Sequence, residues 1–233
     1  MRRIGCLVVL VLLLSASAAC ARDLPFALGR PVAVTHLLPP PPLPGSPEER
    51  AELGELLALQ QARTPEMVEQ VRADAERSAF RFADVLGPGF VAEKLPRATP
   101  FFEALKQAAQ AMDGDGKQYW NRARPAAVDP AIKPCIKTPD SPAYPSGHAT
   151  YGTLVSIVLA NMVPERQREL YARGQAYGFA REVAGVHFPS DVAAGRIVGT
   201  LIAAVLLEDP SFMAAFAEAK AEVRRALGLP ERE

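Results

Sequence analysis

Residues 144–162 read YPSGHATYGTLVSIVLANM, and this stretch is the most informative part of the chain. Residues 149–162 are apolar nearly all round, a pattern typical of a helix that is buried on every side. The segment is shorter than the about 20 apolar residues that a membrane span needs, and the polar Asn161 interrupts it. We therefore expect a central core helix, and either Ser146 or Gly147 can cap its first turn.

A second segment of the same kind covers residues 191–207, where Arg196 and Thr200 interrupt the apolar run. We expect it to be the other central helix. No stretch shows sustained alternation of Val, Ile and Thr, so strands are not expected. Helical periodicity recurs in five further segments, which are 51–62, 65–84, 99–112, 165–184 and 211–227. The predicted fold class is all-α, a compact single-domain helical bundle.

A proline-rich arm precedes this bundle. Residues 22–46 include the run LLPPPP at 37–42, and consecutive prolines favour the extended polyproline II conformation. We expect an extended arm laid over the surface, without a helix. Ser46-Pro47 then carries the signature of a helix start. We place the arm at 22–46 and the all-α domain at 47–233.

The first residues have the pattern of a targeting signal. Arg2 and Arg3 precede the apolar run 4–14, and small residues with an Ala-x-Ala site come next. We predict a signal peptide over 1–21, cleaved after Ala21. Two alternatives stay open, lipoprotein processing before Cys20 and retention of the segment as an N-terminal anchor.

Charge and cysteine content exclude several classes of protein. The 233 residues contain 26 basic and 26 acidic side chains, so the formal net charge is zero. A general nucleic-acid binder needs a broad basic surface, which this balance disfavours. Only 3 cysteines are present, and cleavage after Ala21 would leave Cys135 alone, with no internal disulfide.

A first polar motif runs from Lys117 to Arg124 and closes with Pro125. The two cations are seven residues apart, about two helical turns, so we expect them on one face of a helix. They could bind an anion together. A solvated cationic helix end is the alternative.

A second motif is Pro145-Ser146-Gly147-His148, at the start of the central helix. The free N–H groups of a helix N-terminus form an anion site, and a histidine beside that site can donate a proton. The alternative is an ordinary helix start with an incidental histidine.

A third motif runs from Arg181 through His187 to Asp191. Pro189 disfavours helix at Phe188, so we expect His187 in a turn between two helices. Asp191 could accept a hydrogen bond from one ring nitrogen and leave the other free to attack. A structural His–Asp pair is the alternative.

The motifs together favour an anion over a metal ion. His148, His187 and Asp191 could in principle bind a metal, but Lys117, Arg124 and Arg181 would repel it. The same three cations suit a tetrahedral oxyanion such as phosphate. The chain has no phosphate-binding loop of the G-x-x-x-x-G-K-[ST] type.

These three motifs, K-x6-R-P, P-S-G-H and R-x5-H-x3-D, resemble the signature of the type 2 phosphatidic acid phosphatase (PAP2) superfamily. Within it, the chain resembles the bacterial class A non-specific acid phosphatases. The likeness includes the stretches LLPPPP, YPSGHATYG, SDVAAGRIVG and DPSF. It implies the all-α fold shared by acid phosphatases and vanadium haloperoxidases, a periplasmic location, and no required metal or other cofactor.

The resemblance also implies residue roles. His187 would be the nucleophile, Asp191 its orienting partner, and His148 the general acid and base. The implied phosphate ligands are Lys117, Arg124, Ser146, Gly147 and Arg181. One departure stands out, because Ala180 occupies the place where the family's third motif usually begins with serine.

The expected function is that of a secreted, metal-independent acid phosphatase that hydrolyses phosphate monoesters through a phosphohistidine, with phosphotransfer to alcohols as a side activity. The expected partners are small phosphomonoesters, with phosphate or vanadate as inhibitors and no nucleic acid. The alternatives are a lipid phosphate phosphatase at a membrane surface, a vanadate-dependent haloperoxidase and a non-catalytic phosphate-binding protein. A membrane contact is expected only if Cys20 carries lipid, and a homo-oligomer stays open.

Overall fold

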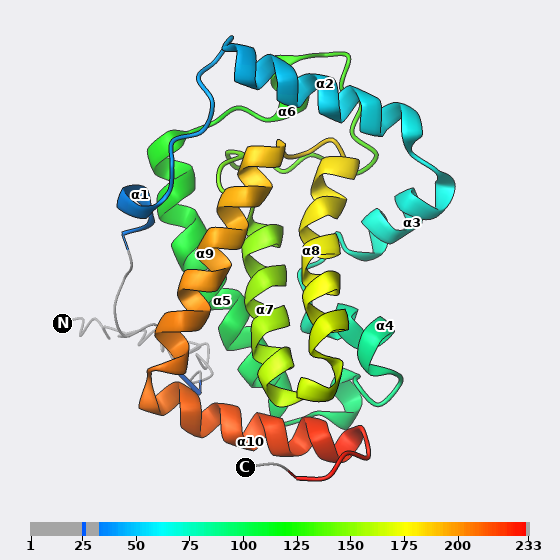
Figure 1. Ribbon diagram of the computed structural model, residues 1–233, viewed down its shortest axis with the longest axis vertical. Helices are drawn as coiled ribbons and strands as arrows, with labels where there is room; N and C mark the ends of the chain where they lie inside the picture. Colours follow the sequence, from blue (N-terminus) through cyan, green and yellow to red (C-terminus); the bar gives the residue numbers. More distant parts are fainter. Residues whose placement is uncertain (1–24, 27–32, 232–233) are drawn as a thin grey trace, which may run out of the picture.

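The computed structural model describes residues 25–26 and 33–231, which form helices and connecting turns with no strand among them (Figure 1). The all-α prediction is therefore confirmed. The α-helices are α1 (Val34–Leu37), α2 (Pro47–Ala62), α3 (Pro65–Ala73), α4 (Ala83–Leu86), α5 (Ala98–Trp120), α6 (Pro125–Val128), α7 (Gly147–Met162), α8 (Gln167–Val183), α9 (Pro189–Leu207) and α10 (Pro210–Ala226). Short 3₁₀ turns cover Ala79–Phe82, Ala92–Lys94 and Pro164–Arg166.

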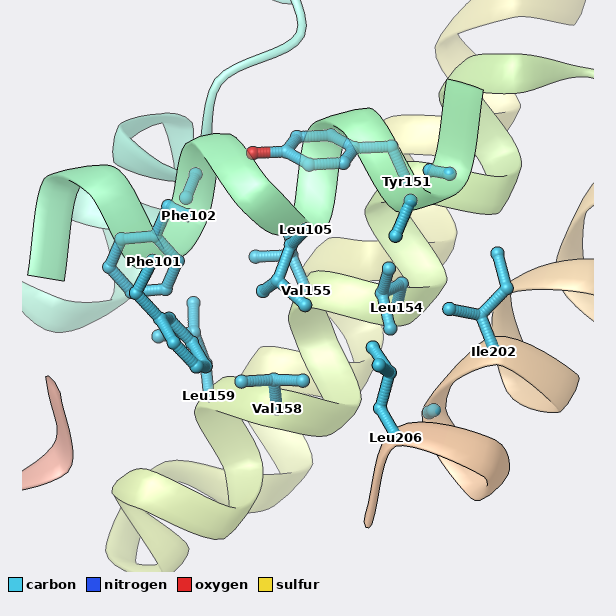
Figure 2. Packing of buried hydrophobic residues seen from close by; sticks show 14 of the residues in the cluster. Phe101, Phe102, Leu105, Tyr151, Leu154, Val155, Val158, Leu159, Ile202 and Leu206 are labelled. Carbon is cyan, nitrogen blue, oxygen red and sulfur yellow. The ribbon is translucent and has the colours of Figure 1, made fainter. Parts of the chain in front are cut away.

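Helix α7 lies at the centre of the bundle, as its apolar sequence predicts. It packs against α8, α9 and α5, while α10 crosses one end of these helices and α2 crosses the other (Figure 1). Figure 2 shows Leu154, Val155 and Leu159 of α7 between the aromatic residues of α5 and Ile202 of α9. All three α7 side chains are fully buried. Burial of such apolar area is the main stabilising term in the fold.

The first half of α9 and the first turn of α7 lie close together. A Cβ atom on Gly199 would overlap the Thr150 carbonyl oxygen, and one on Gly195 would lie 2.8 Å from the Ala149 Cβ. Glycine at both positions lets the two backbones approach. The N–H of Ser146 then donates to the carbonyl oxygen of Asp191 at 2.9 Å. This contact joins the second motif to the third.

The packing of α9 also explains its apolar composition. Among the described residues, α9 is the one helix that is long and apolar enough to span a membrane, with a mean hydropathy of 1.7. Half of that segment is buried inside the protein. Its buried side, including Val198 and Ile202, belongs to the main core.

The structure corrects the prediction of an arm without helix. Residues Val34–Leu37 form the short helix α1, because Val34 is 1% exposed and packs in the core beside α5. Residues 39–43 carry no helix. The predicted signal peptide over 1–21, with Cys20, lies outside the described residues. Cys135 is half-buried and has no disulfide partner in the described part of the chain.

Two helix boundaries also differ from the prediction. The expected helix over 65–84 is interrupted at residues 74–78, because the buried Asp74 binds Arg81 and Arg173 through its side chain. The helix expected over 99–112 continues to Trp120 as α5. Both differences affect the candidate site, since the interruption exposes the carbonyl oxygen of Ala75 and the longer α5 carries Lys117.

Candidate active site

The three motifs meet around one cavity of about 210 Å³. Its lining includes Gly147 and His148 at the start of α7 and His187 between α8 and α9. These helix ends lie at the end of the bundle that α2 crosses (Figure 1). The lining residues are Arg77, Gln110, Asp113, Gly114, Lys117, Arg124, Pro139, Ser141, Gly147, His148 and His187. The lining thus combines both histidines of the motifs with two of the predicted cations and the start of α7.

His187 lies in the turn between α8 and α9, as predicted. Its Nδ1 is 3.1 Å from Asp191 Oδ2, and its Nε2 is 2.8 Å from Arg124 Nη1. Because Arg124 can only donate, Nε2 accepts and carries a lone pair, while the proton resides on Nδ1. Burial and the charges of Arg124 and Lys117 hold the pKa of His187 well below its usual range. The ring is therefore kept neutral, with an unprotonated Nε2.

Arg122 holds Asp191 from the side opposite His187, a role that no sequence motif indicated. Its Nη1 donates to Asp191 Oδ1 at 2.6 Å, and its Nη2 donates to Glu52 Oε2 at 2.8 Å. The guanidinium lies 3.8 Å above the ring of Phe188. Glu52 closes the network by accepting the Ser190 N–H at 2.6 Å. The His–Asp pair is thus fixed from α2, more than a hundred residues away along the chain.

Lys117 and Arg124 both line the cavity, but not in the arrangement that their spacing predicted. They do not share a helix face, because α5 ends at Trp120 and Asn121 takes a left-handed conformation with φ of 44°. Both cations instead donate to the carbonyl oxygen of Pro142, Lys117 at 2.8 Å and Arg124 at 3.2 Å. Burial lowers the pKa of Lys117 to about 8 and that of Arg124 to about 10.

Arg181 is the predicted cation that the structure does not bring to the cavity wall. It lies in the last turn of α8, is 1% exposed and donates to the Val71 carbonyl oxygen at 3.0 Å. Its Nε is buried without a partner among the described residues. Its charge contributes to lowering the pKa of both His148 and His187. Arg181 therefore acts from a layer behind the two histidines.

Ser146, and not Gly147, caps α7, with its Oγ accepting the Ala149 N–H at 3.4 Å. Gly147 begins the helix at the cavity wall, where a Cβ would lie only 2.6 Å from Asp113 Oδ2. A larger residue would fit there only if the carboxyl group moved. The N-terminus of α7, with its partial positive charge, thus faces the cavity.

His148 is held by the backbone that the interrupted helix exposes. Its Nε2 lies 2.9 Å from the Ala75 carbonyl oxygen, and since a carbonyl only accepts, Nε2 carries a proton. The ring stacks on Tyr177 with 5.8 Å between centroids. Burial, with Arg181 and Arg77 nearby, lowers the pKa of His148 well below its usual value. Nδ1 is the ring atom left for a ligand.

Two further charged residues in the cavity were missed because no motif contains them. Asp113 is 3% exposed and lies one turn before Lys117 on α5. Its Oδ2 is 3.4 Å from Arg77 Nη1. Arg77 comes from the irregular segment after α3, so only the folded chain brings it to the site.

The site suits a tetrahedral oxyanion. Three cations and a helix N-terminus surround a neutral histidine whose Nε2 is unprotonated. Within residues 25–26 and 33–231, no three His, Cys, Asp or Glu side chains are grouped closely enough to hold a metal ion. His148, His187 and Asp191 do not form such a group. Ala180, at the departure from the motif, lies in a buried apolar cluster with Val71 and Val183.

Comparisons with known proteins identify similar chains. The profile of the PAP2 superfamily matches residues 103–212. The chain is 32% identical over 197 residues to a non-specific acid phosphatase of Salmonella typhimurium, covering 80% of this chain and 78% of that one. It is 31% identical over 200 residues to a non-specific acid phosphatase of Providencia stuartii, covering 80% and 79%. These matches confirm the resemblance seen in the motifs.

Two solved structures share the fold. A bacterial vanadium-dependent iodoperoxidase superposes with a TM-score of 0.55 at 20% identity, covering 73% of this chain and 51% of that one. A transmembrane PAP2-type phosphatidylglycerolphosphate phosphatase from Bacillus subtilis superposes with a TM-score of 0.51 at 17% identity, covering 69% and 85%. At these identities the likeness concerns the fold alone.

Replacing Glu52 tests whether the outer network stabilises the site. Glu52→Ala leaves Arg122 buried with one of its two carboxylate partners removed, so we expect the free energy of unfolding to fall by about 3 kcal/mol. Urea denaturation followed by circular dichroism measures this change. Glu55→Ala, on the exposed side of the same helix, is the matched control. Equal unfolding midpoints for the two variants would contradict the network's role.

Proposed function

The chain belongs to the PAP2 superfamily, and from this we propose that it is a secreted acid phosphatase that hydrolyses phosphate monoesters without a metal ion, through a phosphohistidine. The observation that carries the proposal is the His187 ring, with Nδ1 on Asp191 and Nε2 against Arg124 at the cavity wall. The names of the relatives, non-specific acid phosphatases, support the reaction class.

In the first step, the lone pair of His187 Nε2 attacks phosphorus. The bond from phosphorus to the ester oxygen breaks, and its electron pair leaves with that oxygen. Charge spreads over the three other phosphate oxygens in the transition state, where Lys117, Arg124 and the α7 N-terminus can stabilise it. Asp191 accepts the hydrogen bond from Nδ1 throughout and stabilises the cationic ring.

His148 serves as the general acid in this step. It gives a proton to the leaving oxygen, and in the second step it takes a proton from the water that attacks the phosphohistidine and breaks the P–N bond. Its burial lowers its pKa in the free protein, while a bound phosphate anion would raise it. The protonated fraction falls as pH rises through that pKa, which supports an acid optimum.

Metal independence rests on the charges that the chain itself supplies. Lys117, Arg124 and Arg77 line the cavity, and Arg181 lies behind it. Such cations can neutralise the transferred phosphoryl group, the role that divalent ions have in many phosphoryl-transfer enzymes. An alcohol in place of water at the second step would give the phosphotransferase side reaction.

Secretion to the periplasm rests on residues 1–21, outside the described part of the chain. Arg2, Arg3 and the apolar run after them support an exported protein. The mass of the mature N-terminus distinguishes cleavage after Ala21 from lipid attachment at Cys20.

Hydrolysis of p-nitrophenyl phosphate between about pH 4 and 8 tests the proposed reaction. We expect turnover that EDTA leaves unchanged and vanadate inhibits, and His187→Ala should lower it at least about 1000-fold, since the nucleophile is lost. His36→Ala, the exposed third histidine, is the control and should keep the full rate.

Activity that only added metal restores would overturn the metal-independent mechanism. Near-normal turnover by His187→Ala would overturn the assignment of the nucleophile. Strong preference for a dispersed phosphatidic acid over soluble monoesters would favour the lipid phosphatase alternative instead.

The general acid can be tested separately through the leaving group. A good leaving group such as p-nitrophenolate departs without a proton, whereas an alkoxide does not. His148→Ala should therefore lower kcat/KM, which reports the step in which the leaving group departs, about 100-fold more for glycerol phosphate than for p-nitrophenyl phosphate. Equal losses for both substrates would show that His148 does not protonate the leaving oxygen.

A further inference from the structure

Among the described residues, Asp113 is the one carboxyl group that lines the phosphate cavity, and the proposed mechanism gives it no role. It faces Lys117 on its own helix α5, Arg77 from the segment after α3, and Thr150 and the Gly147 backbone on α7. Gln110 and His148 line the same cavity. A carboxylate at this place would compete with a bound phosphate for the cationic groups of the cavity.

The hydrogen bonds of Thr150 indicate which form of Asp113 the site holds. Thr150 Oγ1 lies 2.7 Å from Asp113 Oδ1 and 3.2 Å from the Ser146 carbonyl oxygen. A hydroxyl has one proton to donate, and the carbonyl can only accept it. When the carboxyl group is protonated on Oδ1, it donates to Thr150, which donates to Ser146. When Asp113 is a carboxylate, in contrast, Oδ1 and the Ser146 carbonyl oxygen both compete for the single hydroxyl proton of Thr150.

The ion pair of Asp113 is weak in comparison. Arg77 Nη1 is 3.4 Å from Oδ2, at the long end of hydrogen-bond distances. The Lys117 ammonium binds the Pro142 and Pro145 carbonyl oxygens instead. Within the described part of the chain, no basic side chain therefore binds the buried carboxyl group closely, which leaves its charge poorly compensated.

We propose that Asp113 makes phosphate binding depend on acid pH: as a neutral acid it admits the phosphate group beside Gly147, and as a carboxylate it repels it. This inference rests on the proposed function. Asp113 is thus a specificity-determining residue that acts on the charge of the bound phosphate and takes no part in bond breaking.

Two titrations support the proposal. Burial raises the pKa of Asp113 to about 6, and the second pKa of a phosphate monoester is also about 6. At about pH 5 the site therefore combines a neutral carboxyl group with a substrate of low charge. Above about pH 7 it would bring a carboxylate and a dianion together in a buried cavity, where like charges repel strongly.

The test compares Asp113→Asn with wild type. The amide is neutral at every pH and can donate to Thr150 as the acid does. Calorimetric titration with inorganic phosphate gives the ratio of the Kd at about pH 7.5 to the Kd at about pH 5. We expect that ratio to be at least about tenfold smaller for Asp113→Asn than for wild type. Asp115→Asn, the same change at an exposed position of α5, is the control and should keep the wild-type ratio.

Kinetics provide a second readout that a merely structural role would not change. With p-nitrophenyl phosphate at about pH 7.5, Asp113→Asn should lower KM and leave kcat within about twofold. Asp113→Ser, which is also neutral but one bond shorter, carries the same expectation if the amide variant does not fold.

Equal Kd ratios for wild type and the neutral variants would overturn the inference. So would weaker phosphate binding by those variants at both pH values, because that result assigns Asp113 a structural role. If neither wild type nor any variant hydrolyses the ester while the Kd ratios differ as expected, the proposed function fails and the role of Asp113 stands.

Discussion

The candidate site depends on Asp191, which joins the two motifs that contain histidine: it binds His187 of its own motif and Ser146 of the other. Its backbone carbonyl accepts the N–H of Ser146 at the start of α7, and its side chain accepts from His187 Nδ1 and from Arg122. The close approach of α9 to α7 at Gly195 and Gly199 makes the backbone contact possible. One residue thus fixes the position of the His187 ring relative to the N-terminus of α7.

The electrostatics of the site are arranged for a charge that the free protein lacks. Burial lowers the pKa of His187, Lys117 and Arg124 together. Each shift means that the protein disfavours a positive charge there, and a buried anion would reverse it. Binding of phosphate should therefore stabilise the buried positive charges and raise the free energy of unfolding. Asp113 differs from these three groups, because it is an acid. Its negative charge, when present, would partly take the place of the charge of the ligand.

The sequence was sufficient for the helical class and the core helix α7, because apolar periodicity is a local signal. The expectation that His148, His187, Asp191, Lys117 and Arg124 share one site came from the resemblance of the three motifs to a family signature. It could not show that Arg124 lies beyond the end of α5, since the left-handed Asn121 ends the helix after Trp120. Nor could it find Glu52, Arg77 or Asp113, whose contacts are made by tertiary packing and belong to no motif. Arg181 was placed in the right motif but lies behind the cavity.

Isolation of the covalent intermediate would test the proposed chemistry without inference from rates. The protein is mixed with radiolabelled p-nitrophenyl phosphate, quenched in alkali, where a phosphorus–nitrogen bond survives, and digested for mass spectrometry. The geometry of His187 predicts phosphate on the peptide that contains this residue, lost on acid treatment and absent from His187→Ala. Label on another residue, or steady turnover with no labelled protein at any time, would contradict a phosphohistidine at this site.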